Sequence, residues 1–344
     1  MWRFARFAVS ASVTALLLCP RTAAAHDEPV VRSDSTAAPT AAGEAHAEEG
    51  AKEEAEPPWE VIADVVGGAT TTEVLTGGRP TRIESPPTNV FDSTRITAYS
   101  LLIGLERHLG ERLTVGARIP FIQAELRSRT GAAENRSVFL AGNLELEGAF
   151  VIAHGKSWNL VGTLELALPT AGGKEPPTRE EVLAEPEKRF DYKRYDTFAA
   201  AHAASAVRGA YESALFEPGN LGIVPKITAN IHLAKLTITP TVKLENLFNV
   251  TSNAEEVYIN ELVAGVRASY RVFPAVEPGV HVWVTEAHEH THHDDTYSTL
   301  AVFEPFASFH FGGITPTVGA ILPFTGDLAD AKTFGIRVKV AAEF

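Results

Sequence analysis

Apolar and polar side chains alternate one by one through much of the chain. Its last eleven residues, 334–344 (FGIRVKVAAEF), carry Phe, Ile, Val, Val, Ala and Phe at every second position, with Arg, Lys and Glu among the residues between them. A β-strand turns successive side chains to opposite faces, so this segment has one apolar and one charged face. In water such a strand would be an exposed edge that invites aggregation. In a bilayer it can close a barrel, with lipid on one side and the lumen on the other.

The same period-two pattern recurs along the chain, bounded each time by turn-forming residues. The pattern predicts strands over residues 59–66, 93–107, 113–121, 144–150, 160–168, 221–232, 236–245, 258–271, 280–285, 297–311, 314–322 and 334–344. This gives about twelve strands, and an even number is what single-chain bacterial barrels require.

The connections between these strands alternate between short and long. Short turns are expected at HLGE, HGKS, AK, FPAVEPG and FGG, and longer loops at the stretch before residue 92, RSRTGAAENRS, 169–220, TSNAEE, AHEHTHHDD and TGDLADAK. Outer-membrane barrels show this rhythm, with short turns on the periplasmic side, whereas a β-sandwich has no reason to keep it. The predicted fold class is therefore all-β: an antiparallel transmembrane β-barrel of about twelve strands over residues 59–344.

The N-terminus has the form of a secretory signal. Arg3 and Arg6 precede an apolar run over Phe7–Leu18, and small residues follow up to Ala25. This predicts a signal peptide over residues 1–25 that is cleaved after Ala25. Acylation of Cys19 as a lipoprotein is a weaker alternative, because the two bulky leucines before it fit that signal poorly.

Residues 26–58 are rich in Ala, Glu, Thr and Pro and have no apolar period, so we expect a disordered periplasmic tail. After the N-terminus no run of eighteen apolar residues occurs, which excludes a membrane-spanning helix. The net charge of −13 argues against a nucleic-acid partner. We therefore expect the protein in the outer membrane of a Gram-negative bacterium, with the lipid bilayer as its partner.

A long insertion over residues 169–220 interrupts the strands and is expected outside the barrel. It begins charged and proline-rich and continues with the alanine-rich stretch TFAAAHAASAVRGAYESALF, residues 197–216. Helix propensity favours a short helix at or inside the barrel mouth over two more weak strands. Loops of this length are usually functional or disordered.

If the apolar faces meet lipid, the charged residues between them point into the lumen. These lumen-lining candidates are Glu106, Arg118, Glu145, Glu147, Glu165, Lys226, Lys243, Glu245, Glu261, Arg267, Arg271, Arg337 and Lys339. Buried charges must pair or be hydrated, so the mixture of signs suits either a water-filled channel or a salt-bridged plug. No ring of a single sign is visible, so strong ion selectivity is not predicted.

One predicted loop contains a dense group of metal-binding side chains. Imidazoles and carboxylates suit Zn, Cu or Ni, and the candidates are His288, His290, His292, His293, Asp294 and Asp295. The alternative is a polar surface loop of low specificity, because these histidines lack the spacing of a preformed site. No other cofactor is predicted. Ser308 and His310 share a strand face, but without a positioned acid they do not indicate an enzyme.

Three stretches resemble a known family. YSLLIGLERHLGERLTVGARIPF (99–121), GNLELEGAF (142–150) and LVGTLELALPTAGG (160–173) are similar to the outer-membrane transporters associated with meta-pathway phenol degradation. The family's LPTG reads Leu168, Pro169, Thr170, Ala171 here, with the glycine displaced to Gly172. The resemblance implies a channel for small solutes, hydrophobic ones included, and no catalytic residues.

We therefore expect a channel or transporter for passive passage of a small-molecule solute. The alternatives are a metal-capturing surface protein and a structural barrel with a plugged lumen. The terminal strand ending at Phe344 also resembles the signal by which the outer-membrane assembly machinery recognises its clients.

Overall fold

The computed structural model describes residues 59–71, 94–128, 135–172, 179–185, 187, 192–250, 256–291 and 295–344. The predicted signal peptide and the predicted tail lie outside these residues. Within them, no helix is long and apolar enough to cross a membrane.

Thirteen strands and three α-helices are found in the described residues. The strands are β1 (Trp59–Thr71), β2 (Thr94–Leu109), β3 (Leu113–Ser128), β4 (Arg136–Ala141), β5 (Leu144–His154), β6 (Trp158–Leu168), β7 (Asn220–Leu233), β8 (Leu236–Asn249), β9 (Glu256–Tyr270), β10 (Val276–Thr291), β11 (Asp295–Phe309), β12 (Ile314–Pro323) and β13 (Phe334–Glu343). The helices in the described residues are α3 (Arg179–Ala184), α4 (Tyr192–Val207) and α5 (Gly326–Asp330), with the 3-10 helix η2 at Ser213–Leu215.

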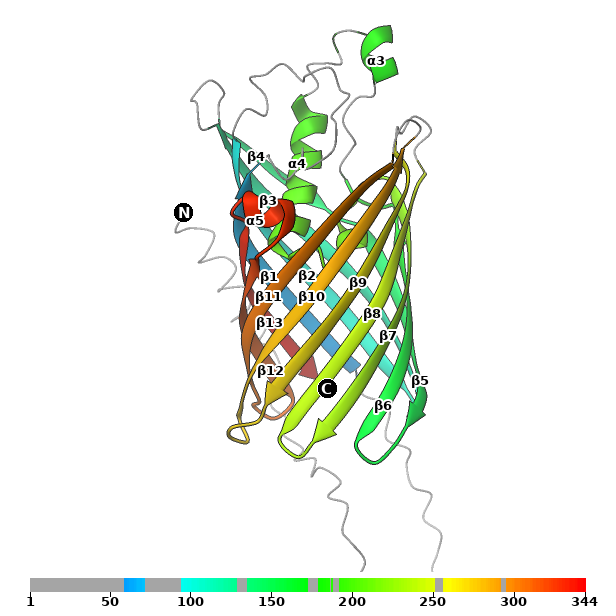
Figure 1. Ribbon diagram of the computed structural model, residues 1–344, viewed down its shortest axis with the longest axis vertical. Coiled ribbons are helices and arrows are strands. Elements are labelled where there is room, and N and C mark those ends of the chain that lie inside the picture. Colours follow the sequence, from blue (N-terminus) through cyan, green and yellow to red (C-terminus); the bar gives the residue numbers. More distant parts are fainter. Residues whose placement is uncertain are drawn as a thin grey trace, which may run out of the picture. The chain divides into compact units, whose positions relative to one another are not determined.

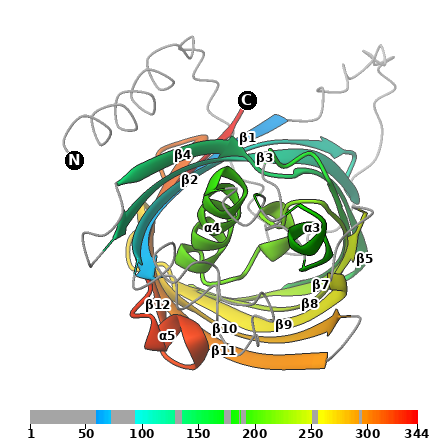
Figure 2. The same cartoon turned by 90° about the horizontal axis from the view of Figure 1, so that it is seen from above.

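The strands form one closed antiparallel barrel. Each strand pairs with its neighbours in sequence, and β1 pairs with both β2 and β13, which joins the two ends of the sheet (Figures 1 and 2). β4 and β5 both pair with β3, end to end, and are separated by Gly142 and Asn143. They share one position in the wall, so the barrel has twelve strand positions. The predicted fold class is confirmed.

Most strands are longer than predicted, and two regions differ most. Residues 127–137 were expected to be a loop, but β3 extends to Ser128 and β4 begins at Arg136. The histidine-rich loop is shorter than predicted, because β10 continues to Thr291 and β11 begins at Asp295. In both places the pairing of neighbouring strands extends past the point where the alternation of hydrophobicity fades, since backbone hydrogen bonds do not depend on side-chain polarity.

The outer face of the barrel is apolar, although its side chains are exposed. Ile103 on β2, Leu164 on β6 and Ile336 on β13 retain 43, 55 and 53% of their accessible surface. Their strand neighbours in sequence, among them Arg337, point to the opposite side and are largely buried. An apolar exterior around a polar interior is the arrangement that hydrocarbon imposes on a barrel, and it places the protein in the outer membrane.

Part of the insertion expected outside the barrel lies inside it. Figure 2, seen from above, shows α4 within the ring of strands, and α4 contacts β1, β2, β3 and β4. Six of its alanines, between Ala199 and Ala206, are at most 3% exposed. They pack on inward-facing apolar residues of the wall such as Ile96, Ile122 and Leu126. A helix buried on all sides needs no polar face, so the alanine-rich stretch forms a core inside the lumen.

Candidate functional site: a plugged lumen

We call residues 192–219, from the start of α4 to the start of β7, the plug. α4 ends where Gly209 and Ala210 adopt positive φ values of 72° and 49°, and the amide of Ala210 donates to the carbonyl of Ser205 at 3.0 Å. A glycine in the left-handed region is a common helix C-terminus. Only glycine fits here, because a Cβ on Gly209 would lie 2.5 Å from Cζ2 of Trp283 on β10. The indole Nε1 of Trp283 donates to the carbonyl of Gly209 at 3.0 Å, which fixes this turn against the wall.

The barrel wall is recessed where the end of α4 touches it. Gly68 on β1 and Gly335 on β13 are register partners across the seam that closes the barrel. A Cβ on Gly68 would lie 2.9 Å from Cγ1 of Val207, and a Cβ on Gly335 would overlap the carbonyl oxygen of Val207. The two glycines thus form a notch that the last residue of α4 fills. The wall and the plug are complementary in shape at this point.

Arg208 is the central charge of the plug. Its side chain is fully buried, and its guanidinium makes an ion pair with Asp64 on β1 and a second, at 2.7 Å, with Glu212 of the plug. Its Nη1 also donates to the hydroxyl of Ser100 at 3.3 Å. Glu212 in turn lies 3.4 Å from Arg118 on β3. Burial by itself would raise the pKa of the Glu212 carboxyl, but Arg208 and Arg118 outweigh it and hold that pKa far below its usual range.

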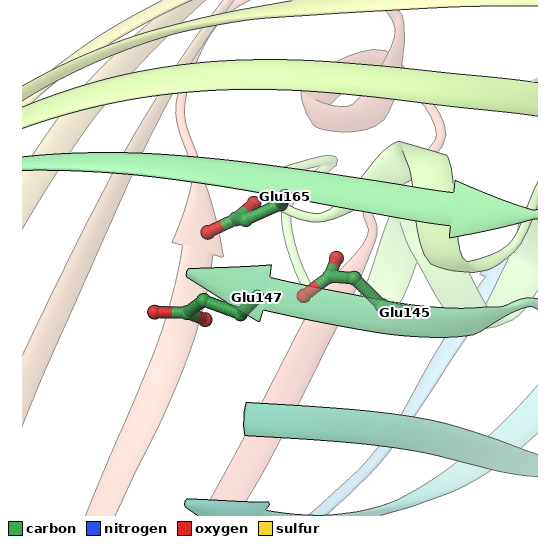
Figure 3. A group of neighbouring side chains, drawn as sticks. All are labelled: Glu145, Glu147 and Glu165. Carbon is green, nitrogen blue, oxygen red and sulfur yellow. The ribbon is translucent and has the colours of Figure 1, made fainter. Parts of the chain in front are cut away.

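Three carboxylates from two neighbouring strands surround Arg118. Glu145 and Glu147 on β5 and Glu165 on β6 point toward one another, with carboxylate oxygens within 4.8 Å (Figure 3). Such a triad has the chemistry of a cation site. Here the guanidinium of Arg118 occupies the centre, paired with Glu145, with Glu147 at 3.6 Å and with Glu165 at 3.4 Å. Lys226 on β7 adds a second cation at Glu165.

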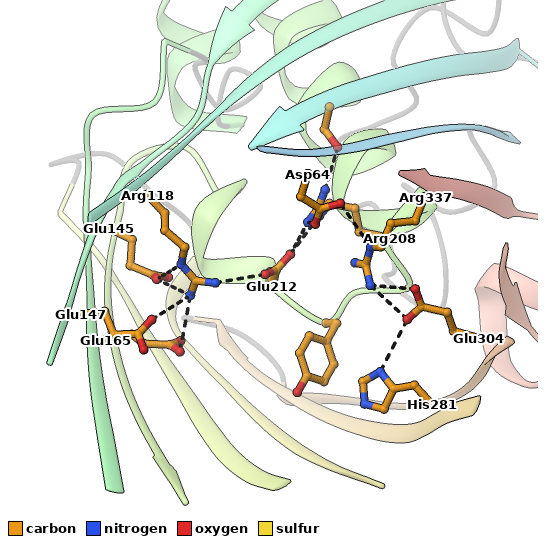
Figure 4. Close-up of polar contacts among 12 residues, drawn as sticks. Asp64, Arg118, Glu145, Glu147, Glu165, Arg208, Glu212, His281, Glu304 and Arg337 are labelled. Atoms are coloured by element: carbon orange, nitrogen blue, oxygen red, sulfur yellow. Dashed lines mark hydrogen bonds and ion pairs between the residues drawn. The ribbon is translucent and has the colours of Figure 1, made fainter. Parts of the chain in front are cut away.

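A matching cluster lies on the other side of Arg208. Nε of Arg337 on β13 lies 3.4 Å from Asp64, and Nη1 of Arg337 donates to both oxygens of Glu304 at 2.9 and 3.0 Å. Nδ1 of His281 lies 3.5 Å from Glu304. Figure 4 shows the result: a continuous series of ion pairs crosses the lumen from one wall to the other through the plug. Buried charges in such a series stabilise one arrangement, because removal of any member leaves a charge without a partner.

A third contact ties the plug to β8. Lys243 donates to the backbone carbonyl of Tyr211 and pairs with Glu245 at 2.5 Å. Glu245 accepts the amide of Ala214 at 2.8 Å. Glu261 on β9 is hydrogen-bonded to the hydroxyl of Ser213.

The predicted lumen residues therefore fall into three groups. Those joined into the ion-pair series or bonded to the plug are Arg118, Glu145, Glu147, Glu165, Lys226, Lys243, Glu245, Glu261 and Arg337. Glu106, Arg267 and Lys339 are inward-facing and half-buried but lie outside the series. Arg271 lies past the end of β9 at a short turn, with its side chain 49% exposed, beside Glu277.

The histidine-rich segment is divided by the structure. His288 and His290 lie on β10 rather than in a loop, with ring centroids 3.8 Å apart, and His288 stacks on Tyr297 of β11 at 4.1 Å. The segment of His292, His293 and Asp294 lies outside the described residues, and Asp295 begins β11. Ser308 bonds to the hydroxyl of Thr317 at 2.8 Å, whereas Nε2 of His310 lies 3.4 Å from Glu277.

The sequence analysis missed five members of the ion-pair series: Asp64, Arg208, Glu212, His281 and Glu304. Asp64, His281 and Glu304 each occupy an inward-facing position in a strand, so stricter use of the two-residue period would have identified them. Arg208 and Glu212 lie in the insertion, where no period assigns a face.

Comparisons with known proteins support the fold. No family model and no curated protein matches the chain. An outer membrane channel from Pseudomonas putida F1 superposes with a TM-score of 0.55 at 13% identity, covering 84% of this chain and 96% of that one. The beta domain of the Bordetella autotransporter BrkA gives 0.44 at 11% identity over 84% and 100%, and the NanC porin gives 0.43 at 8% over 82% and 100%.

At 13% identity the likeness to the channel from Pseudomonas putida F1 shows the fold alone, that of an outer-membrane β-barrel. The link to meta-pathway phenol transporters stays a prediction.

Proposed function

We propose that the protein is an outer-membrane channel for passive passage of a small polar solute, and that the plug controls its lumen. The observation that carries the proposal is the pairing of an apolar exterior with a charged interior. A barrel that served only as a scaffold would gain stability from an apolar interior, because buried ion pairs contribute little net stability. The density of interior charge also favours polar over hydrophobic solutes.

The plug makes movement part of this function. The ion-pair series and α4 lie across the lumen at the level of Arg208. We infer that passage requires the plug to shift within the lumen. The plug joins the wall through contacts of two kinds, apolar packing around α4 and ion pairs around Arg208.

Reconstitution into planar bilayers tests the proposal. We expect small, fluctuating conductance for the native chain and larger, steadier conductance when residues 192–217 are replaced by a short Gly/Ser linker. If neither form shows conductance or solute flux, the protein is a structural barrel with a plugged lumen. The ion-pair series across the lumen also suggests this second interpretation. Heat-modifiable electrophoretic mobility confirms that both forms are folded barrels.

We also propose, from the sequence, a metal-binding role for the histidine-rich segment. Its support is the proximity of His288 and His290 on one face of β10. Calorimetric titration with Zn²⁺ and Cu²⁺, before and after replacement of both histidines by Gln, tests this role. Equal binding by the two forms removes it.

A further inference from the structure

Among the residues that the structure describes, two cations on the inner wall have no carboxylate oxygen within 4 Å. Arg267 on β9 and Lys339 on β13 face the lumen and are half-buried. Every other inward-facing Arg or Lys on the described strands, together with Arg208 of the plug, has a carboxylate oxygen within 4 Å. A charge in a confined lumen is costly unless it is hydrated or matched by an opposite charge.

Lys339 lies on the short-turn side of the ion-pair series, and Arg267 lies level with its member His281. Lys339 follows Arg337 by two residues on the same face of β13, and Arg267 is the register partner of His281 on β10. Arg267 and Lys339 lie within electrostatic range of each other, and Arg337 lies within range of both. Three cationic groups from β9 and β13 therefore converge on one part of the lumen.

Aromatic and hydroxyl side chains lie beside these cations. The guanidinium of Arg267 lies 3.7 Å from the ring centroid of Phe306, which holds it in place without neutralising it. The register partner of Lys339 on β12 is Thr317, whose hydroxyl bonds to Ser308. Cations held by an aromatic face and flanked by hydroxyls suit an anion with oxygen or halide character.

The nearby carboxylates are already used elsewhere. Glu304 is bound by Arg337, and Asp64 by Arg208 and Arg337. Glu277, near Arg267, accepts the hydroxyl of Ser269 at 2.5 Å and lies beside Arg271.

Two further carboxylates lie within electrostatic range of Lys339. These are Glu60 on β1 and Glu106 on β2, and neither comes within 4 Å of its ammonium in the described structure.

We propose that Arg267 and Lys339 form a binding site for a small anion in the lumen, on the periplasmic side of the plug. The site binds a halide or a small oxyanion such as acetate or phosphate. Because of its position, an anionic solute would bind there after it has passed the plug. The assignment of the solute class rests on the proposed channel function, but the binding site does not.

Anion binding is measured directly by soaking crystals of the full chain in sodium bromide. We expect an anomalous bromide peak between Nζ of Lys339 and the guanidinium of Arg267, and its loss in Lys339→Gln and in Arg267→Gln. Lys235→Gln, which removes an exposed lysine at the β7–β8 turn, is the matched control and keeps the peak. Well-ordered crystals without bromide at this position overturn the proposal, and competition by acetate or phosphate distinguishes an oxyanion site from a halide site.

A second experiment measures ion selectivity from the reversal potential in a KCl gradient. Lys339→Gln and Arg267→Gln are each expected to shift it toward cation preference, with Lys339→Arg and Lys235→Gln unchanged. Conductance without this shift shows that the site plays no part in permeation. That result rules out an anion as the solute. Absence of conductance in the native chain contradicts the channel function and leaves the bromide result to decide the site.

Discussion

The notch formed by Gly68 and Gly335 gives the sharpest test of how the plug is held. Gly335→Ala adds a single methyl group to the inner wall. That methyl carbon would lie more than about 1 Å closer to the carbonyl oxygen of Val207 than the 3.4 Å at which ordinary contact begins. Because the atom it meets belongs to backbone, no side-chain rotation relieves the overlap. The end of α4 must move away from the wall.

The magnitude follows from the cost of overpacking. An extra methyl in a filled site costs about 1–3 kcal/mol, which corresponds to a shift of about 5- to 150-fold in an equilibrium. The pairing of β1 with β13 remains, since the backbone hydrogen bonds of Gly335 are unaffected. The cost therefore falls on docking of the plug rather than on closure of the barrel.

Single-channel recording and amide hydrogen exchange measure the effect. We expect Gly335→Ala to raise the open fraction and to speed exchange in residues 192–219, with unchanged heat-modifiable mobility. Gly148→Ala is the matched control, because it adds a methyl to β5 where nothing lies within 4 Å. If Gly335→Ala exchanges and conducts like the native chain and the control, the plug is not held by this notch.

Three further predictions concern the polar contacts of the plug. Arg208→Met removes the cation that Asp64 and Glu212 share, which leaves Asp64 with Arg337 and Glu212 with Arg118, each at 3.4 Å. It is expected to weaken plug docking by about 3 kcal/mol in hydrogen exchange, and adding Asp64→Asn should recover part of this. Trp283→Phe removes the hydrogen bond to Gly209 and should cost about 1 kcal/mol by the same measurement. The pKa of Glu212 is lowered in the folded state, so its contribution is present above its unfolded value of about 4.3 and is lost as pH falls toward the folded value. The protection factors of the plug amides, which correct for the pH dependence of intrinsic exchange, should then stay constant from pH 8 to pH 5 and fall only in stronger acid. Glu212→Gln should reduce that acid dependence.

Strand alternation carried most of the fold prediction. In β13 the apolar residues at even positions, such as Val338, face outward, and Arg337 and Lys339 face inward, as the period requires. The rhythm of short and long connections predicted which end carries the loops. The sequence analysis underestimated β2 and β3, whose inner faces carry Ile96 and Ile122 and are apolar on the long-loop half. The outer positions there, 95, 97, 123, 125 and 127, are Arg, Thr, Gln, Glu and Arg, the reverse of the pattern lower in the barrel. This reversal indicates apolar packing inside the barrel, here against α4.

The sequence by itself determined the barrel, because a period of two and the need to satisfy every backbone hydrogen bond in hydrocarbon leave few other folds. It also determined that the interior is charged. Only the tertiary structure decided how those charges are used. The partners Asp64 and Arg208 are 144 residues apart, and the fit of Val207 into the notch of Gly68 and Gly335 joins three distant segments. Contacts of this kind depend on closure of the barrel around the plug, which no local pattern of residues encodes.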